Sequence, residues 1–444
     1  MKLRLAFGVV LAAACGGRAV DGDVPLGCNT DLECKGDRIC VAGRCEDAAL
    51  GASGGRTGAG GSAGFPMFGG ASFGGSPFGM GGASFGSGGS RVSAQGGATS
   101  GTGGASIGAT PTRLDIDASA LIADPLRARL YATVRGNAAS HGNEVVVIDA
   151  RLDTVLTSLF VGSDPDSLAL SDDGTRLWVG LHGALSIREV DLTQFPPVAG
   201  AQYVVPPGDF AFDAVHAGPM VVLPGEPESV AISLHYDGLS PSFAGLAVID
   251  SGNPREKQTP SHTGASRLTG GPPGFLFGFN DQHTGFEFFS IAVDASGVTQ
   301  SETRGLVDGF SSDIRYDGGY VVATSGQVVD VTKPSAPVRA GKFPFTGQVV
   351  PHGANSRVLM LSSVSAGTSS SSGSGNNMLV LRNLNLSTFR EDGETPINGR
   401  FNSVQDFVEA APGVFAFIDA NTASFGSTPS PSNVYVFSVP EFAE

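Results

Sequence analysis

The chain has 444 residues, carries a formal net charge of −15 and contains 65 glycines but only five cysteines. This acidic balance argues against a nucleic-acid partner, because no basic stripe is present to neutralise phosphates, and against binding to an anionic membrane surface by charge. All the cysteines lie at or before Cys45 and many of the glycines fall between Gly51 and Gly108, so only the chain after Thr110 can form a large core.

Residues 1–14 are typical of a secretory signal, with Lys2 and Arg4 ahead of an apolar run. Two modes of processing fit the end of this run. Ala12–Ala14 forms an A-x-A cleavage site, which predicts free secretion. The stretch that ends in Cys15 and Gly16 resembles the bacterial lipobox, which implies a lipoprotein anchored at the outer membrane or cell surface through its lipid alone. We favour lipidation of Cys15, because secretion would leave one of five cysteines unpaired in an oxidising compartment.

A small Cys-rich module is predicted over 15–47, and its remaining cysteines are Cys28, Cys34, Cys40 and Cys45. So short a segment cannot bury a core, and two disulfides are expected to hold it. Four cysteines allow three pairings, of which we favour Cys28–Cys40 with Cys34–Cys45 as the more compact. A zinc site is the alternative, but the absence of C-x2-C spacing and the oxidising compartment disfavour it.

The tract at 48–110 is rich in Gly, Ser and Ala. We expect a disordered linker there, because such a composition cannot offset its ordering entropy by burial. As a flexible coil of about sixty residues it would span ~40–45 Å on average, enough to hold a folded head away from a membrane. The phenylalanines that recur between Phe65 and Phe85 suggest a self-associating or glycan-stacking tract, but we favour a spacer.

From Pro111 onward the sequence is a succession of short apolar runs separated by turn residues. Two of these runs open at Arg129 and Arg176, and between them lie Val145–Asp149, Thr154–Val161 and Ser167–Ser171. Four runs of strand length per period of roughly 40–50 residues predict the blades of a β-propeller. Helical periodicity is nearly absent from this part of the chain.

The same stretch resembles the YVTN repeat of bacterial surface propellers. The resemblance is carried by Leu130-Tyr131, Val147-Ile148-Asp149, Gly162-Ser163-Asp164-Pro165 and Ser171-Asp172-Asp173-Gly174. It implies an all-β fold, a seven-bladed β-propeller of the YVTN/WD40-like kind, over 111–444. It leaves the function open, because propellers host many functions.

We count seven units in the propeller. They are Leu121–Val161, Ser167–Val205, a third that begins at Ser229, Ser266–Leu306, Asp308–Phe345, Thr346–Ile397 and Phe401–Phe442. Thr112–Ile116 precedes the first unit, and we predict that it pairs as the outer strand of the seventh. Such closure would remove the exposed edges of the sheet.

The arrangement of the units suggests where a ligand would bind. The longer connections join the second strand of a unit to the third, so they emerge on one face, beside the beginnings of the first strands. We expect the channel mouth to hold Asp166, Glu228, Arg267, Asp313 and Gln405, and the loops of that face to present His141, Tyr236 and His283.

No metal site, cofactor or catalytic motif is predicted, because the sequence has no H-E-x-x-H, Walker A or EF-hand pattern. An Asp recurs at the end of the third strand in several units, for example Asp149 and Asp191. This recurrence is typical of a turn residue that bonds its own backbone rather than of a metal ligand. The single tryptophan, Trp178, is expected to pack in the core.

The layout favours an extracytoplasmic, lipid-anchored binding or adhesion module for an envelope or matrix protein or polysaccharide. The alternative is an enzyme with its site in the central channel, a lactonase-like hydrolase or an oxidoreductase, since some YVTN-like propellers are lactone hydrolases. A structural spacer is the third interpretation. Absence of a motif weighs little against the enzyme, because a propeller can build a site from residues distant in sequence.

Overall fold

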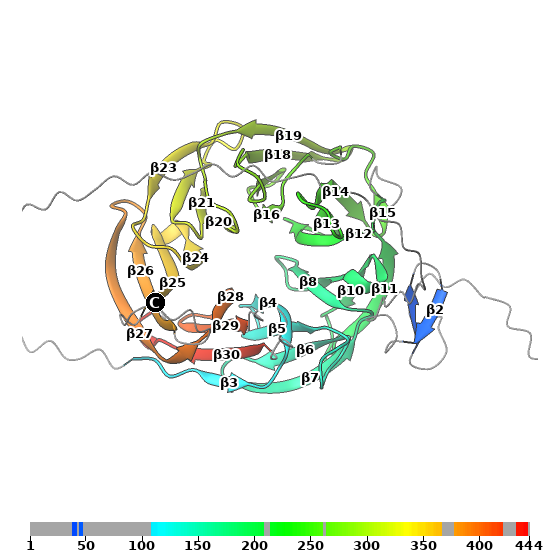
Figure 1. Ribbon diagram of the computed structural model, residues 1–444, viewed down its shortest axis with the longest axis horizontal. Helices are drawn as coiled ribbons and strands as arrows, with labels where there is room; N and C mark the ends of the chain where they lie inside the picture. The colour runs from blue at the N-terminus through cyan, green and yellow to red at the C-terminus, as the bar shows by residue number, and fades with distance from the viewer. Residues whose placement is uncertain are drawn as a thin grey trace, which may run out of the picture.

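The computed structural model describes residues 38–41, 44–47, 108–207, 214–260, 263–365, 377–420 and 432–442. From residue 108 onward these described residues form seven four-stranded sheets arranged in a ring (Figure 1). The predicted all-β, seven-bladed propeller is thereby confirmed. Within each blade the first strand borders the centre of the ring and the fourth lies at the rim (Figure 1).

The strands follow the chain, four to a blade. Blade 1 consists of β4 (Ala118–Asp124), β5 (Arg129–Val134), β6 (Glu144–Asp149) and β7 (Thr154–Phe160), and blade 2 of β8 (Pro165–Leu170), β9 (Arg176–Leu181), β10 (Ser186–Asp191) and β11 (Val198–Val204). Blade 3 consists of β12 (Val215–Leu223), β13 (Glu226–Tyr236), β14 (Phe243–Asp250) and β15 (Asn253–Pro254), and blade 4 of β16 (Arg267–Thr269), β17 (Phe275–Phe279), β18 (Phe288–Asp294) and β19 (Gly297–Thr303).

The remaining blades repeat this order. Blade 5 consists of β20 (Ile314–Asp317), β21 (Tyr320–Ala323), β22 (Gln327–Asp330) and β23 (Val338–Lys342), and blade 6 of β24 (Gln348–His352), β25 (Arg357–Ser365), β26 (Asn377–Asn385) and β27 (Arg390–Phe401). Blade 7 consists of β28 (Ser403–Ala411), β29 (Val414–Ala420), β30 (Asn433–Ser438) and β3 (Thr112–Leu114). Short 3-10 helices lie at η2 (His182–Ala184), η3 (Gly353–Asn355) and η4 (Pro440–Phe442).

The ring is closed by a strand from the beginning of the propeller sequence. β3 pairs antiparallel with β30, with Thr112, Arg113 and Leu114 opposite Val436, Tyr435 and Val434. The predicted outer strand of the seventh unit is therefore confirmed. Because β3 covers the free edge of β30, the last blade presents no more open edge than the others do.

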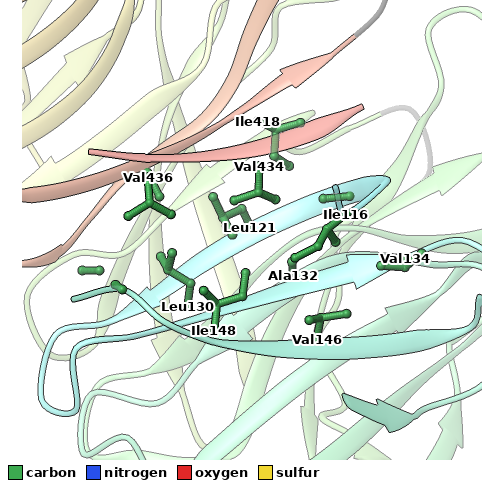
Figure 2. Close-up of a cluster of buried hydrophobic side chains, with 14 of the residues drawn as sticks. Ile116, Leu121, Leu130, Ala132, Val134, Val146, Ile148, Ile418, Val434 and Val436 are labelled. Atoms are coloured by element: carbon green, nitrogen blue, oxygen red, sulfur yellow. The ribbon is translucent and has the colours of Figure 1, made fainter. Parts of the chain in front are cut away.

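The core is divided into clusters between neighbouring blades. On β5, Leu130, Ala132 and Val134 pack toward blade 7, against residues such as Ile418 and Val434 (Figure 2). Tyr131 points to the opposite side of the same strand and packs toward blade 2. Strand side chains alternate in direction, so a strand inside the ring buries both of its faces. Trp178 is likewise fully buried, which confirms its predicted place in the core.

The two faces of the ring are built from different connections. One face, here called the loop face, carries the connections between the second and third strands of each blade and those from one blade to the next. The opposite face, here called the turn face, carries the turns between first and second and between third and fourth strands. The longer connections predicted to share one face, such as β5–β6, β13–β14 and β17–β18, do join second to third strands.

The third unit begins earlier than its sequence indicates. Ser229 was predicted to lie on a first strand, but β12 is the first strand of blade 3 and β13, which holds Ser229, is the second. Gly218 and Pro219 interrupt β12 and are typical of a turn, which conceals the strand. The structure accommodates them with a register shift between Ala217 and Met220, because proline cannot donate a ladder hydrogen bond.

The predictions for the N-terminal segment lie mostly outside the described residues. These are the signal at 1–14, the lipidation of Cys15, the linker at 48–110, and Cys28 and Cys34 of the disulfide module. Cys40 lies on β1 (Arg38–Val41) and Cys45 on β2 (Arg44–Asp47), directly opposite each other in an antiparallel pair. The disulfide pairing itself stays a prediction.

Closure by β3 can be tested with two truncated chains. A chain of residues 117–444 loses β3 and the buried Ile116, whereas a chain of residues 108–444 keeps both. We expect the shorter chain to be less stable in urea by about 2–5 kcal/mol, the usual loss for removing a buried Ile side chain, and to self-associate through the exposed edge of β30. Equal stability of the two chains would contradict a role for β3 in closing the ring.

Candidate functional site

The first strands of the seven blades line a central channel with a volume of about 640 Å³. Every blade contributes side chains to its wall, including Ser119, Asp166, His216, Arg267, Asp313, Gln348 and Gln405. Charged and polar groups from blades far apart in the sequence therefore meet around one axis. A channel of this size and polarity can hold a small polar ligand or a single side chain of a partner.

Local irregularities direct some of these side chains into the channel. The pairing of first with second strand shifts in register on β4, β8, β12 and β28. The shift on β28 lies between Gln405 and Val408, and Asp406 within it has a left-handed backbone with φ of 45°. An extra residue in one strand re-aims its neighbours, and such bulges are frequent beside functional sites.

Four of the five predicted channel residues lie in the channel wall. Asp166, Arg267, Asp313 and Gln405 line it, as the sequence indicated. Glu228 does not, because it stands near the beginning of β13, a second strand, and at the turn face. There its carboxylate lies 3.3 Å from Nε of Arg176. The correction follows directly from the strand that the sequence concealed in blade 3.

The three residues predicted on the loop face have different surroundings. His141 is about one-third exposed and its Nδ1 lies 2.9 Å from a carboxylate oxygen of Glu144. His283 is 41% exposed and its Nε2 lies 3.3 Å from Glu287. Tyr236 is only 1% exposed and packs in the core of blades 2 and 3, so the prediction that it is presented to a ligand is wrong. An aromatic residue at a strand end has no sequence signal that distinguishes the two positions.

One side of the channel is held by an arginine–carboxylate pair. Nη2 of Arg267 lies 3.0 Å from Oδ2 of Asp281, which is almost fully buried. The hydroxyl of Ser266 donates to the other oxygen of Asp281 at 2.6 Å, which fixes the carboxylate. The guanidinium of Arg267 is therefore oriented before any ligand arrives.

A second set of charged side chains, from blades 5 and 7, also lies in the channel. Arg315 lies 3.2 Å from Asp313 and 3.9 Å from Asp406, while the backbone N–H of Leu121 donates to Asp406 at 3.1 Å. Burial in the channel wall raises the pKa of Asp406, and the nearby Arg315 and the Leu121 N–H act in the opposite direction. The channel thus presents cationic and anionic groups together rather than a surface of one sign.

A cluster that the sequence did not indicate lies where blades 2 and 3 meet at the loop face. It consists of His182 on η2, His216 at the beginning of β12, and Asp237 just after β13. Nε2 of His182 lies 2.9 Å from Oδ1 of Asp237, and Nδ1 of His216 lies 3.2 Å from the same oxygen. The two imidazole rings are stacked, with centroids 3.9 Å apart and planes within 6°.

Asp166 connects this cluster to the channel. Its Oδ2 lies 3.0 Å from Nδ1 of His182 and 3.1 Å from Nη2 of Arg135. The hydrogen bond that His182 donates to Asp166 raises the pKa of His182, and the charge of Asp237 acts in the same direction. Burial lowers the pKa of His216, and the proximity of His182 lowers it further. Two adjacent histidines are thereby driven toward different protonation states.

A third histidine lies behind this pair. His235 stands opposite His216 in the pairing of β12 with β13, and the rings meet edge to face at 5.9 Å. Its Nε2 lies 3.1 Å from the Ser233 hydroxyl, which itself donates to the Ala265 carbonyl. The hydroxyl is thus left as the acceptor, which assigns the proton to Nε2 of a neutral ring.

The sequence held only a weak signal for this cluster. His182, His216 and His235 are far apart in the chain or fall on a strand that was not recognised, and they have none of the spacings typical of metal ligands. In the ring, the beginning of a first strand lies beside the connections between second and third strands. His216 at the beginning of β12 is thus brought next to His182, in the β9–β10 connection, and Asp237, in the β13–β14 connection. Pairing of strands, rather than spacing along the chain, therefore creates the site.

Four of the recurring aspartates at the ends of third strands bond their own turns, which confirms that they are turn residues. Oδ1 of Asp149, Asp191, Asp294 and Asp330 accepts a hydrogen bond from a backbone N–H two residues later, at 2.7–2.9 Å. Asp250 differs, because it pairs with Arg255 through Nε at 2.8 Å. All of these residues lie at the turn face, away from the channel mouth.

Comparison with known proteins supports the fold and nothing narrower. Neither the protein-family models nor the curated protein sequences compared with this chain match it. Two solved structures match with a TM-score of 0.50 and 12% identity: U3-55K, over 74% of this chain and 98% of its own, and the RRP9 WD40 repeats, over 75% and 98%. Kuenenia stuttgartiensis hydrazine synthase matches at a TM-score of 0.37 and 12% identity, over 73% of this chain and 80% of its own, and carries no argument.

The protein is therefore a seven-bladed β-propeller with WD40-like structural neighbours. The resemblance to the YVTN repeats of bacterial surface proteins stays a prediction from the sequence. Within the described residues, no helix is both long and apolar enough to span a membrane.

The pKa of the part-buried His235 lets us predict how stability depends on pH. Burial, with His216 and Arg267 nearby, lowers the pKa of His235 from 6.5 to about 4, and only Asp281 and a backbone contact oppose this. Between these two values the unfolded chain binds a proton that the folded chain does not. Stability should therefore fall as the pH drops from about 6.5 to about 4, with His235 contributing about 3 kcal/mol of the loss.

Urea unfolding of the wild type and of His235→Gln at several pH values, in a metal chelator, measures this contribution. The variant should lose less stability over the same range, whatever its stability at neutral pH. His141→Gln, a change at a part-exposed histidine, serves as the control and should follow the wild type. Identical pH dependence of all three proteins would rule out His235 as the responsible group.

Proposed function

We propose that the protein is an extracytoplasmic, lipid-anchored binding module that holds an envelope protein or polysaccharide at the loop face of its propeller. The observation that carries this proposal is the opening of a rigidly built polar channel on the same face as the longer connections. Binding residues are usually found on loops that a rigid scaffold positions. The signal-like residues 1–14, Cys15 and the Gly-rich tract supply the anchor and the spacer in this proposal.

The rim of the channel offers an aromatic contact. Phe310, in the connection between blades 4 and 5, is 60% exposed. Its ring packs edge to face on Phe286, with centroids 5.0 Å apart. His283 stands in the connection between β17 and β18 and Arg304 in the same connection as Phe310, and both contact Glu287. An exposed aromatic ring beside fixed polar groups suits a sugar ring or a peptide side chain.

An enzyme acting in the channel is the second candidate. The observation that favours it is the cluster of His182, His216 and Asp237 beside Asp166, in which neighbouring groups have their pKa values shifted in opposite directions. Clefts with such shifts are candidates for acid–base chemistry. A screen of lactones and related sugar acids for turnover, with His182→Ala as the comparison, tests this candidate.

Retention on immobilised protein tests the binding proposal. The full chain with Cys15→Ser, which removes the lipid, is exposed separately to solubilised envelope proteins and to purified envelope polysaccharide. We expect one of the two to be retained, and Phe310→Ala to weaken its binding about 10-fold, the effect of losing an aromatic anchor.

The matched control is Leu126→Ala, which truncates an equally exposed apolar residue at the turn face. It should leave retention unchanged. Retention of neither fraction would contradict the binding function. Retention that Leu126→Ala reduces and Phe310→Ala does not would place the partner on the turn face instead.

A further inference from the structure

The side chains of His182, His216 and Asp237 bring three potential metal-ligand atoms to within 4.8 Å of one another. Two of the three separations, 2.9 and 3.2 Å, are already close to the spacing of about 3.3 Å that ligands have around a tetrahedral ion with bonds of ~2.0–2.1 Å. Imidazole and carboxylate together form a ligand set that zinc and similar divalent transition metals favour.

From this geometry we propose that His182, His216 and Asp237 form a binding site for a divalent transition-metal ion of the zinc type. The ligands would be Nε2 of His182, Nδ1 of His216 and a carboxylate oxygen of Asp237. The inference is independent of the partner at the loop face, because it concerns only how these side chains are arranged.

The surroundings of His182 are those of a metal-bound histidine. Oδ2 of Asp166 accepts the hydrogen of Nδ1 at 3.0 Å, so the ring is oriented with Nε2 toward Asp237. A carboxylate that holds the distal nitrogen of a ligating histidine fixes both its tautomer and its direction. Arg135 in turn contacts the same oxygen of Asp166 at 3.1 Å and holds that carboxylate in place.

Two buried polar atoms in and beside the cluster make no hydrogen bond of normal geometry. Both Nδ1 of His216 and Oδ1 of Asp166 are buried and make no hydrogen bond of normal geometry within the described residues, and Nδ1 of His216 lies 3.2 Å from Oδ1 of Asp237. The side chain of His216 is only 13% exposed. A metal ion bound at Nδ1 of His216 would give this buried nitrogen a well-formed bond.

Binding requires one local rearrangement. A metal ion lies in the plane of each imidazole that holds it, whereas the rings of His182 and His216 are stacked within 6° of parallel. His182 is fixed by Asp166, whereas Nδ1 of His216 contacts Asp237, which would itself become a ligand of the ion. The ring of His216 therefore turns about its side-chain torsions, while the backbone of β12 stays in place.

The site borders the channel. Asp166 and His216 both belong to the channel wall, so the remaining coordination positions of the ion would be reached from the channel. Water or an anionic group of a ligand would fill them. A zinc ion with three protein ligands and an open position is the arrangement of catalytic rather than structural sites.

Titration calorimetry with Zn²⁺ on the full, oxidised chain tests the proposal. The wild type should bind one ion, and both His216→Asn and Asp237→Asn should weaken binding by about 100-fold or more. Asp166→Asn, which removes only the positioning group, should weaken it by about 10–100-fold. His352→Asn is the matched control, because Nε2 of His352 also lies 2.8 Å from a carboxylate, that of Glu409, but away from the cluster.

Two measurements on the wild type keep the test independent of whether a variant folds. Co²⁺ should give visible absorption bands without the near-ultraviolet band of a thiolate ligand, which excludes the N-terminal cysteines. Zn²⁺ should protect His182 and His216, but not His352, from modification by diethyl pyrocarbonate.

Failure of the wild type to bind Zn²⁺ or Co²⁺ would overturn the proposal. So would binding that persists in His216→Asn and Asp237→Asn, or a thiolate band with Co²⁺, because the ion would then lie elsewhere. In those cases the cluster is an ion-pair network alone, in which a proton on His182 joins the two carboxylates.

Discussion

Burial of both faces of every inner strand is the constraint on which the structure depends. A strand such as β5 packs Leu130 toward one neighbouring blade and Tyr131 toward the other, so no blade can bury its side chains alone. Each blade needs two neighbours, and seven blades satisfy this only when the ring is complete. The pairing of β3 with β30 therefore does more than cover an edge. It joins the first and the last strand of the propeller within blade 7 and so completes the ring.

The same constraint makes the channel a rigid place to hold side chains. The first strands cannot shift without disturbing two packed interfaces, so groups such as Arg267 and Asp166 stay where the strands place them. The register shifts on β4, β8, β12 and β28 occur on the strand of the blade that has an open side. An unpaired residue is tolerated there because its polar groups reach the channel rather than the core.

The sequence predicted the architecture well because turn chemistry and strand length repeat with the blades. Val147–Asp149 and the closing strand at Thr112 were recognised from local pattern alone. Blade 3 was misassigned because Gly218 and Pro219 imitate a turn within β12, and Glu228 was then placed in the channel. Burial on both faces also removes the polar–apolar alternation that would tell a channel-facing residue from a core residue. Tyr236 was misplaced because an aromatic residue at the end of a strand has no signal that distinguishes a loop position from a core position, and His216 was missed because β12 was not recognised.

The two faces of the ring use the same residue types for different purposes. At the turn face, Asp191 and Asp294 bond the backbone of their own turns, and Arg176 and Arg255 pair with carboxylates on adjoining strands. These groups satisfy one another, which is what a structural role requires. At the loop face, His182, His216 and Asp237 bring three potential ligand atoms to within 4.8 Å of one another. Buried polar atoms without hydrogen bonds occur at the turn face as well, for example Nε of Arg357, so they do not distinguish the two faces. The functional assignment therefore rests on the gathering of His182, His216 and Asp237 at one point, since aspartates and basic residues occur at both faces.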